Sequence, residues 1–259
     1  MISGDPRVFE KIKDNQKDKA IFIPTRMGRP LKPSIETLSQ TTIDKARMVR
    51  ASKIAYESGF RKAQEYLDSQ QIPWDIDVPL SSRASLVLLG EEGEVKIAYR
   101  GTKIRDINDV TADAQILTGT EESNPEFISA EEQLRLVTER YGPPSELIGY
   151  SLGGAKAITL GSKANIDTTT FNPFLGKTLV SGKGKGRHQL FRTTEDFASI
   201  GIGLAPKKSN WKVDSILPHQ DRLNPIEAHE LENFSEVSAR RPGNTEVLMR
   251  GVQRQGTKT

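Results

Sequence analysis

Apolar residues recur at helical spacing within residues 42–69, where Ile43 and Ala46 begin the pattern. Gly59 lies inside this stretch, and glycine often marks a break between helices. The pattern therefore predicts one long helix or two shorter ones. By contrast, residues 1–40 mix Lys, Pro, Gly and Asp around one short apolar patch. We expect them to form an extended basic N-terminal arm with little regular structure.

A β-hairpin is indicated further along the chain. Residues 85–90 and 94–101 are rich in Val, Leu, Ile and Tyr, and they flank the turn sequence Gly-Glu-Glu-Gly. Such residues favour strands, and a short connection that contains glycine favours a hairpin. We therefore expect two antiparallel strands here, the second of which leads into Gly101.

A capping pattern marks the next helix. Ser129 is followed three residues later by Glu132, and apolar residues at helical spacing come after them. Gly142 and the two prolines directly behind it stop such a pattern. The sequence therefore predicts a helix that begins at Ser129 and ends before Gly142.

The centre of the predicted sheet is the segment 146–150, which is short and largely apolar, as buried parallel strands are. Residues 152–165 behind it have the pattern of a helix, and residues 168–171 and 189–192 are two further strand candidates. Helices that alternate with strands of this kind predict an α/β fold, with a mostly parallel central sheet and helices on both faces. We assign this domain to residues 41–238.

Ser151 lies between the predicted strand and the predicted helix, in the sequence Gly-Tyr-Ser-Leu-Gly. This matches the G-x-S-x-G elbow, in which a strained turn lifts the serine hydroxyl clear of the sheet. The small flanking residues let the strand and helix backbones pass closely. The alternative is an ordinary glycine-rich turn. Because the elbow requires the strand and helix context found here, we interpret Ser151 as a nucleophile and the fold as α/β-hydrolase-like.

A nucleophilic serine needs a base, and the base needs an acid that orients it. The chain has three histidines, His188, His219 and His229. In α/β-hydrolases the order along the chain is serine, acid, histidine, and all three histidines follow Ser151. The order alone therefore leaves the identity of the base open, and it leaves several acids open as its partner.

Five phrases in order along residues 86–234 resemble the class 3, or fungal-type, lipase family, over somewhat more than half of the chain. They are Tyr-Arg-Gly-Thr ending at Thr102, the pair Asp109 and Asp113, the elbow extended to Gly154, the phrase ending at Phe174, and residues 191–199 around Asp196. Two residues depart from the family pattern, since Tyr150 replaces a histidine and Asn172 replaces a glycine. The spacings from Ser151 to the later residues are also shorter than in secreted fungal enzymes.

The resemblance implies an α/β-hydrolase in which Ser151 is the nucleophile, Asp196 the orienting acid and His229 the base. It also implies an oxyanion hole built from the backbone N–H of Leu152 and from Thr102. Asp214 remains the rival candidate for the orienting acid.

The segment after Thr102 corresponds to the position of the family's lid, and here residues 103–109 are rich in charge. This favours a small or partly polar ester, or a phospholipid, over bulk triglyceride as the substrate. The predicted function is a serine carboxylic ester hydrolase of lipase or phospholipase type that acts through an acyl-enzyme. The alternative is a lipase-like fold that serves as a structural or interaction protein, and acyl transfer or thioester cleavage by the same residues is a third hypothesis.

Composition excludes several other chemistries. The chain has no cysteine, so it has no disulfides, thiolate metal sites or catalytic thiol. Asp109 and Asp113 lie in a polar segment where such acids are usually solvated, so we predict no metal site. The Gly- and Lys-rich loop at residues 181–187 lacks the G-x-x-x-x-G-K-[ST] pattern, so nucleotide binding is not expected. We expect no cofactor.

The net charge of +3 is unevenly distributed, because residues 239–259 carry five basic residues against one acidic residue. Such a basic C-terminal tail is usually solubilising. It also suits peripheral contact with a membrane or another anionic surface, and terminal arms suit protein assembly. We do not expect nucleic acid as a partner. The sequence has neither a signal-peptide pattern nor a run of about 18 apolar residues, so we expect a soluble protein that is intracellular or part of an assembly.

Overall fold

The computed structural model describes residues 38–101, 125–174, 185–193, 196, 210–216 and 229–235 of the chain. All of them belong to one compact unit, Glu36–Thr259. Nearly all of the predicted N-terminal arm and all of the predicted C-terminal tail lie outside the described residues. None of the helices in the described ranges is long and apolar enough to cross a membrane.

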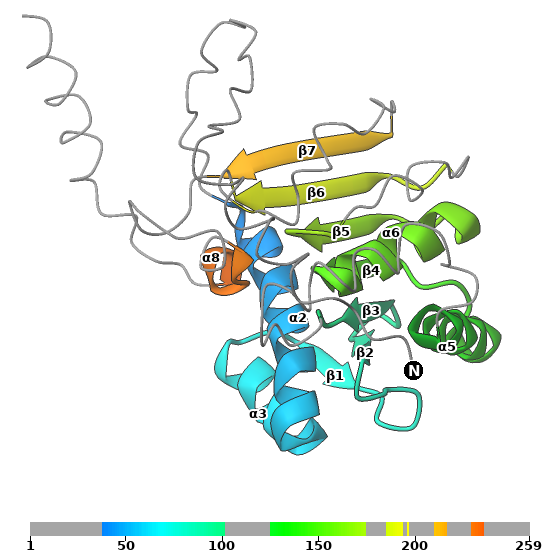
Figure 1. The fold of residues 1–259 in the computed structure, drawn as a ribbon. Helices are drawn as coiled ribbons and strands as arrows, with labels where there is room; N and C mark the ends of the chain where they lie inside the picture. Colours follow the sequence, from blue (N-terminus) through cyan, green and yellow to red (C-terminus); the bar gives the residue numbers. More distant parts are fainter. Residues whose placement is uncertain are drawn as a thin grey trace, which may run out of the picture. The chain divides into compact units, whose positions relative to one another are not determined.

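Seven strands form one sheet within these residues, and their order across the sheet is their order along the chain (Figure 1). They are β1 (Trp74–Ile76), β2 (Ser85–Gly90), β3 (Val95–Tyr99), β4 (Glu146–Tyr150), β5 (Thr168–Phe171), β6 (His188–Thr193) and β7 (Trp211–Ile216). The pairs β1–β2 and β2–β3 are antiparallel, and every pair from β3 to β7 is parallel. The sheet is therefore mixed but mostly parallel, and the strands β3 to β7 all end at one edge.

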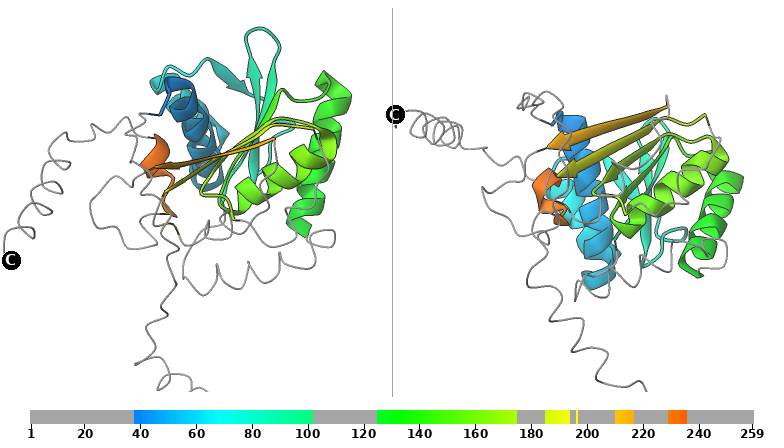
Figure 2. Two further views of the ribbon diagram at one scale, coloured as in Figure 1. Left: turned by 90° about the horizontal axis from the view of Figure 1, so that it is seen from above. Right: turned by 45° about the horizontal axis from the view of Figure 1, so that its top comes forward.

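Helices cover both faces of the sheet. They are α2 (Gln40–Ser58), α3 (Phe60–Ser69), α5 (Pro125–Tyr141), α6 (Leu152–Ala164) and α8 (Glu232–Ser235). Figure 2 shows α2 and α8, in blue and orange, across the strands from α5 and α6, in green. Along β4, Leu147 packs with residues of α5 and α6, whereas Ile148 packs with residues of α2 and α8, because successive side chains of a strand point to opposite faces. The predicted α/β fold is confirmed, and its central strand–serine–helix unit makes it α/β-hydrolase-like.

Gly59 separates two helices where the sequence left one or two open. Its φ of 90° lies in a region that favours glycine, and its N–H still donates to the carbonyl of Ala55 at 2.9 Å. Ser39 caps the start of α2 by accepting a hydrogen bond from the N–H of Thr42 at 3.2 Å. The stretch is therefore two helices, and the first begins slightly before the predicted Thr42.

The helix predicted to begin at Ser129 begins earlier. α5 starts at Pro125 and has Glu126 in its first turn, so Ser129 lies inside the helix rather than at its cap. Proline is pre-organised for the first helical position, and an acidic side chain there interacts favourably with the helix dipole. Pro125 and Glu126 therefore favour a helix start four residues before the capping pattern at Ser129. The predicted end is confirmed, since Gly142 follows the last residue of α5 with a φ of 85°.

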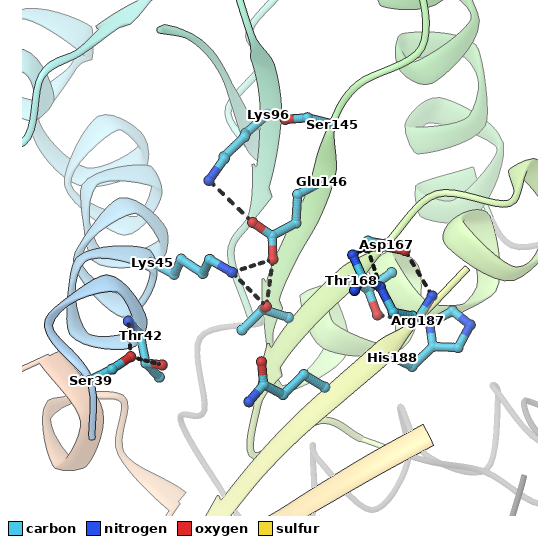
Figure 3. Close-up of polar contacts among 12 residues, drawn as sticks. Ser39, Thr42, Lys45, Lys96, Ser145, Glu146, Asp167, Thr168, Arg187 and His188 are labelled. Carbon is cyan, nitrogen blue, oxygen red and sulfur yellow. Dashed lines mark hydrogen bonds and ion pairs between the residues drawn. The ribbon is translucent and has the colours of Figure 1, made fainter. Parts of the chain in front are cut away.

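The edge at which the parallel strands begin is held by a buried carboxylate. Glu146, the first residue of β4, accepts a hydrogen bond from Lys45 of α2 at 2.6 Å, and it lies 3.2 Å from Lys96 of β3 (Figure 3). Thr169 of β5 donates to the same carboxylate at 2.5 Å. Buried charges are tolerated when they are paired in this way. This edge therefore belongs to the scaffold, whereas Ser151 follows the opposite end of β4.

Candidate active site

Ser151 occupies the turn between β4 and α6 in a conformation that is rare for a residue with a side chain. Its φ is 52° and its ψ is −122°, which lies outside the regions that L-residues readily adopt. Neighbouring backbone groups hold it there, since its N–H donates to Phe171 O at 3.1 Å and its carbonyl accepts from Phe174 N at 3.0 Å. The predicted elbow is thus present as a strained turn that is held by the end of β5 and by the segment directly after it.

Two glycines of the elbow are required by the closeness of the backbones. A Cβ on Gly149 would lie 2.2 Å from the carbonyl oxygen of Gly153. A Cβ on Gly153 would lie 2.3 Å from the carbonyl oxygen of Tyr99, at the end of β3. Both distances are far below van der Waals contact. The G-x-S-x-G spacing therefore has a steric purpose, as predicted from the sequence.

The hydroxyl of Ser151 lies against a histidine that is itself bound to an acid. Nε2 of His229 is 2.9 Å from Oγ of Ser151, and Nδ1 of His229 is 2.6 Å from Oδ1 of Asp196. The side chains of His229 and Asp196 are fully buried, and Ser151 is 4% exposed. Three residues far apart in the sequence thus form one hydrogen-bonded line at the edge where the parallel strands end.

Tyr150 supports the histidine from the strand. Its ring centroid lies 5.1 Å from that of His229, with the two planes tilted by 34°. Burial raises the pKa of the Tyr150 phenol well above its ordinary value, and the nearby carboxylates of Glu230, Glu232 and Asp196 add to the rise. Tyr150 therefore remains a neutral aromatic neighbour of the imidazole throughout the physiological pH range.

The other histidines that the sequence left open are placed differently. His188 is 1% exposed, and it begins β6 at the opposite edge of the sheet. Its ring nitrogens lie 2.8 Å from Oγ1 of Thr168 and 3.1 Å from Oγ of Ser162. A buried imidazole with two hydroxyl partners is a structural residue. His219 lies outside the described residues.

The rival acid is likewise occupied elsewhere. Asp214 of β7 accepts a hydrogen bond from Gln189 at 3.3 Å and lies 3.2 Å from Nζ of Lys212. The carboxylate that contacts His229 is that of Asp196.

One of the two residues named for the oxyanion hole can be placed. Leu152 is the first residue of α6, and the N–H groups of a first helical turn have no partner within the helix. These groups and the helix dipole favour a negative charge beside Ser151. Thr102, the charged segment 103–109, and the pair Asp109 and Asp113 lie outside the described residues.

Asn172 is a buried residue of this site that the sequence does not single out as functional. It directly follows β5, and its side-chain amide contacts Thr193 and the backbone carbonyl of His229. The only signal in the sequence was its departure from the glycine of the lipase pattern.

Among the described residues, no group of three or more His, Asp or Glu side chains is arranged to hold a metal ion.

Comparisons with known proteins add a weak structural likeness to this geometry. No family model matches the chain, and no curated protein matches its sequence. The crystal structure of the esterase domain of a protein from Rhodothermus marinus is similar at 16% identity and a TM-score of 0.32, and the match covers 58% of this chain and 82% of that chain. At this level of likeness, a function has to be argued from the chain's own residues.

Proposed function

We propose that this protein is a serine ester hydrolase in which Ser151 is the nucleophile, His229 the general base and Asp196 the acid that orients the imidazole. The observation that carries the proposal is the buried line from Ser151 Oγ to His229 Nε2 at 2.9 Å and from His229 Nδ1 to Asp196 Oδ1 at 2.6 Å. Nucleophile, base and orienting acid within hydrogen-bond reach of one another are the arrangement that nucleophilic catalysis requires.

In the first half of the reaction, Ser151 Oγ attacks the ester carbonyl while Nε2 of His229 takes its proton. Asp196 accepts the Nδ1–H, which leaves the lone pair of Nε2 directed at the serine. The tetrahedral oxyanion forms beside the N-terminus of α6, where the N–H of Leu152 donates to it, and Thr102 supplies the second donor. His229 then gives its proton to the leaving alcohol, and the acyl group stays on Ser151.

In the second half, a water molecule takes the place of the alcohol. His229 removes a proton from this water as it attacks the acyl carbonyl, and it returns the proton to Ser151 Oγ when the tetrahedral intermediate collapses. The products are a carboxylic acid and the regenerated serine. Asp196 keeps the same tautomer of the imidazole in both halves.

For the substrate, we propose a small or partly polar carboxylic ester or a phospholipid, within the lipase and phospholipase type that the class 3 lipase resemblance implies. The charged segment 103–109 supports this choice over bulk triglyceride, because a charged segment cannot form an apolar lid. The basic C-terminal tail would bring the protein to an anionic lipid surface.

The test is hydrolysis of p-nitrophenyl butyrate and of a fluorescent phospholipid by the wild type, Ser151→Ala and Ser162→Ala. Ser162 is the matched control, because its hydroxyl also lies close to a histidine, 3.1 Å from Nε2 of His188, but at the other edge of the sheet. We expect Ser151→Ala to lose at least about 1,000-fold in rate and Ser162→Ala to stay close to the wild type. The preferred substrate decides between esterase and phospholipase.

Circular dichroism establishes that each variant is folded. A folded wild type that hydrolyses neither substrate would contradict the proposal and favour a structural or interaction role. Equal activity of the wild type and Ser151→Ala would show that another group performs the reaction.

A further inference from the structure

Asn172 directly follows β5 and contacts the backbone of the proposed base, His229. It is fully buried and has a φ of 40°, in the left-handed region that asparagine tolerates better than most residues. Its backbone N–H donates to Phe191 O of β6 at 2.8 Å. The residue is therefore held at the point where the ends of β5 and β6 meet.

The side-chain amide of Asn172 bonds in two directions. Its Oδ1 accepts a hydrogen bond from the N–H of Thr193 at 2.8 Å, and its Nδ2 donates to the backbone carbonyl of His229 at 3.0 Å. Since one partner can only donate and the other can only accept, the orientation of the amide is fixed by chemistry. A single side chain thus connects the end of β6 with the backbone of the proposed base.

Thr193 carries this connection to the acid. The N–H of Asp196 donates to the carbonyl of Thr193 at 3.3 Å, so the residue that Asn172 holds also holds the backbone of Asp196. The amide of Asn172 therefore holds the backbone of His229 directly and the backbone of Asp196 through Thr193. An aspartate has the same shape but no donor for the His229 carbonyl, and a glycine has neither group.

We propose that Asn172 is a positioning residue that fixes His229 and Asp196 relative to each other and to Ser151. It does so by bonding the backbone of the base and the backbone that precedes the acid. Its effect on turnover rests on the proposed esterase function. Its effect on the geometry of the histidine does not, so the two ideas can fail separately.

The experiment uses two substitutions at Asn172 and the same two at a matched position. Asn172→Asp keeps the acceptor for Thr193 but loses the donor for His229, and Asn172→Gly keeps the backbone conformation but removes the amide. Asn165 is the control, because it also has a left-handed backbone, with a φ of 59°, and its Oδ1 also accepts a backbone hydrogen bond, from Lys185 at 2.8 Å. It precedes β5, whereas Asn172 follows it.

The first readout is kinetic, on p-nitrophenyl butyrate. We expect kcat to fall about 10- to 100-fold in both Asn172 variants with KM changed by less than about 3-fold, because misplaced catalytic groups lower the rate of the chemical step. Asn165→Asp and Asn165→Gly should stay within about 2-fold of the wild type. Denaturant unfolding of all four variants separates this effect from lost stability.

The second readout is the low-field NMR signal of the His229 Nδ1 proton shared with Asp196, assigned by its loss in Asp196→Asn. We expect the signal to move or broaden in both Asn172 variants and to stay in place in both Asn165 variants. A wild type without esterase activity whose signal still responds in this way would refute the proposed function and uphold the positioning role.

Three results would overturn the inference. The first is an unchanged signal with unchanged kcat in folded Asn172→Gly. The second is a rise in KM at constant kcat. The third is unfolding of both Asn172 variants while both Asn165 variants fold, which would assign Asn172 to the stability of the fold.

Discussion

Nδ1 of His229 and Oδ1 of Asp196 lie 2.6 Å apart, and neither side chain is exposed to solvent. A buried carboxylate in this position binds the Nδ1–H and directs the lone pair of Nε2 at Ser151 Oγ, 2.9 Å away. The parallel sheet brings this acid to the serine as well. Ser151 follows the end of β4 and Asp196 follows the end of β6, and parallel strands end at the same edge.

Asp196→Asn should leave the protein folded and lower kcat by about 10,000-fold, because an amide cannot hold the imidazole in the same tautomer. The control is Asp214→Asn, which changes the other candidate acid, on β7. Steady-state kinetics on p-nitrophenyl butyrate measures both. If Asp214→Asn were the variant that lost activity, the assignment of the acid would be wrong.

Substitutions of His229 and of His188 should affect different properties, ester hydrolysis in the first case and the free energy of unfolding in the second. We expect His229→Gln to abolish ester hydrolysis in a folded protein. His188→Gln should retain activity and lower the free energy of unfolding by about 1–3 kcal/mol, because it disturbs the buried partners Ser162 and Thr168. Urea unfolding and the hydrolysis assay, run on the same preparations, provide the comparison. Loss of activity in folded His188→Gln would contradict the structural role.

The sequence predicts strands β2 to β6 well, because their residues are mostly buried and therefore apolar or β-branched. It does not predict β1 or β7, at the two edges of the described sheet. Lys212 and Asp214 interrupt the apolar pattern of β7, and β1 has only three residues. An edge strand has a neighbouring strand on one side only, so fewer of its side chains are buried and its composition resembles that of a loop.

Within the candidate site, a local sequence pattern likewise predicts some residues and not others. Ser151 is predictable because the elbow is a local motif, with steric requirements that fix its spacing. His229 and Asp196 are not predictable from local pattern, since their proximity depends on the order and direction of distant strands; the family resemblance supplied them. Nothing in the local sequence reveals that Asn172 bonds to the backbone of His229, because that contact joins segments 57 residues apart.

Gly153→Ala should destabilise the protein strongly, because its Cβ would lie 2.3 Å from Tyr99 O. Overpacking against backbone typically costs about 1–3 kcal/mol or more, and here it also displaces Ser151, so activity should fall as well. Gly90→Ala is the control, since the nearest atom is the flexible carboxylate end of Glu94. Equal free energies of unfolding for the two variants would show that the elbow has room to relax.

Lys156 of α6 should make stability depend on pH. It is 3% exposed, and burial lowers the pKa of its ammonium group below the ordinary 10.5, although the carboxylate of Glu126 opposes this by favouring the charged form. Between the lowered pKa and 10.5 the unfolded chain binds more protons than the folded one, so this group makes stability rise with pH in that window.

Lys156→Met should therefore flatten the rise in the free energy of unfolding as the pH approaches 10.5 from below. It should cost little stability at pH 7, because Glu126 is about half exposed and remains solvated. Urea unfolding at a series of pH values measures this, with Lys163→Met as the control on the exposed side of the same helix. An unchanged slope in Lys156→Met would show that Lys156 is not the group responsible.

Covalent labelling shows whether Ser151 is an activated nucleophile. A fluorophosphonate loses fluoride when an activated serine attacks its phosphorus, and mass spectrometry of the digested protein locates the adduct. The assignment of Ser151 as the nucleophile predicts one adduct, on Ser151, which is absent in Ser151→Ala and forms far more slowly in His229→Gln. A folded wild type that remains unlabelled at Ser151, or that carries its adduct on another serine, would contradict it.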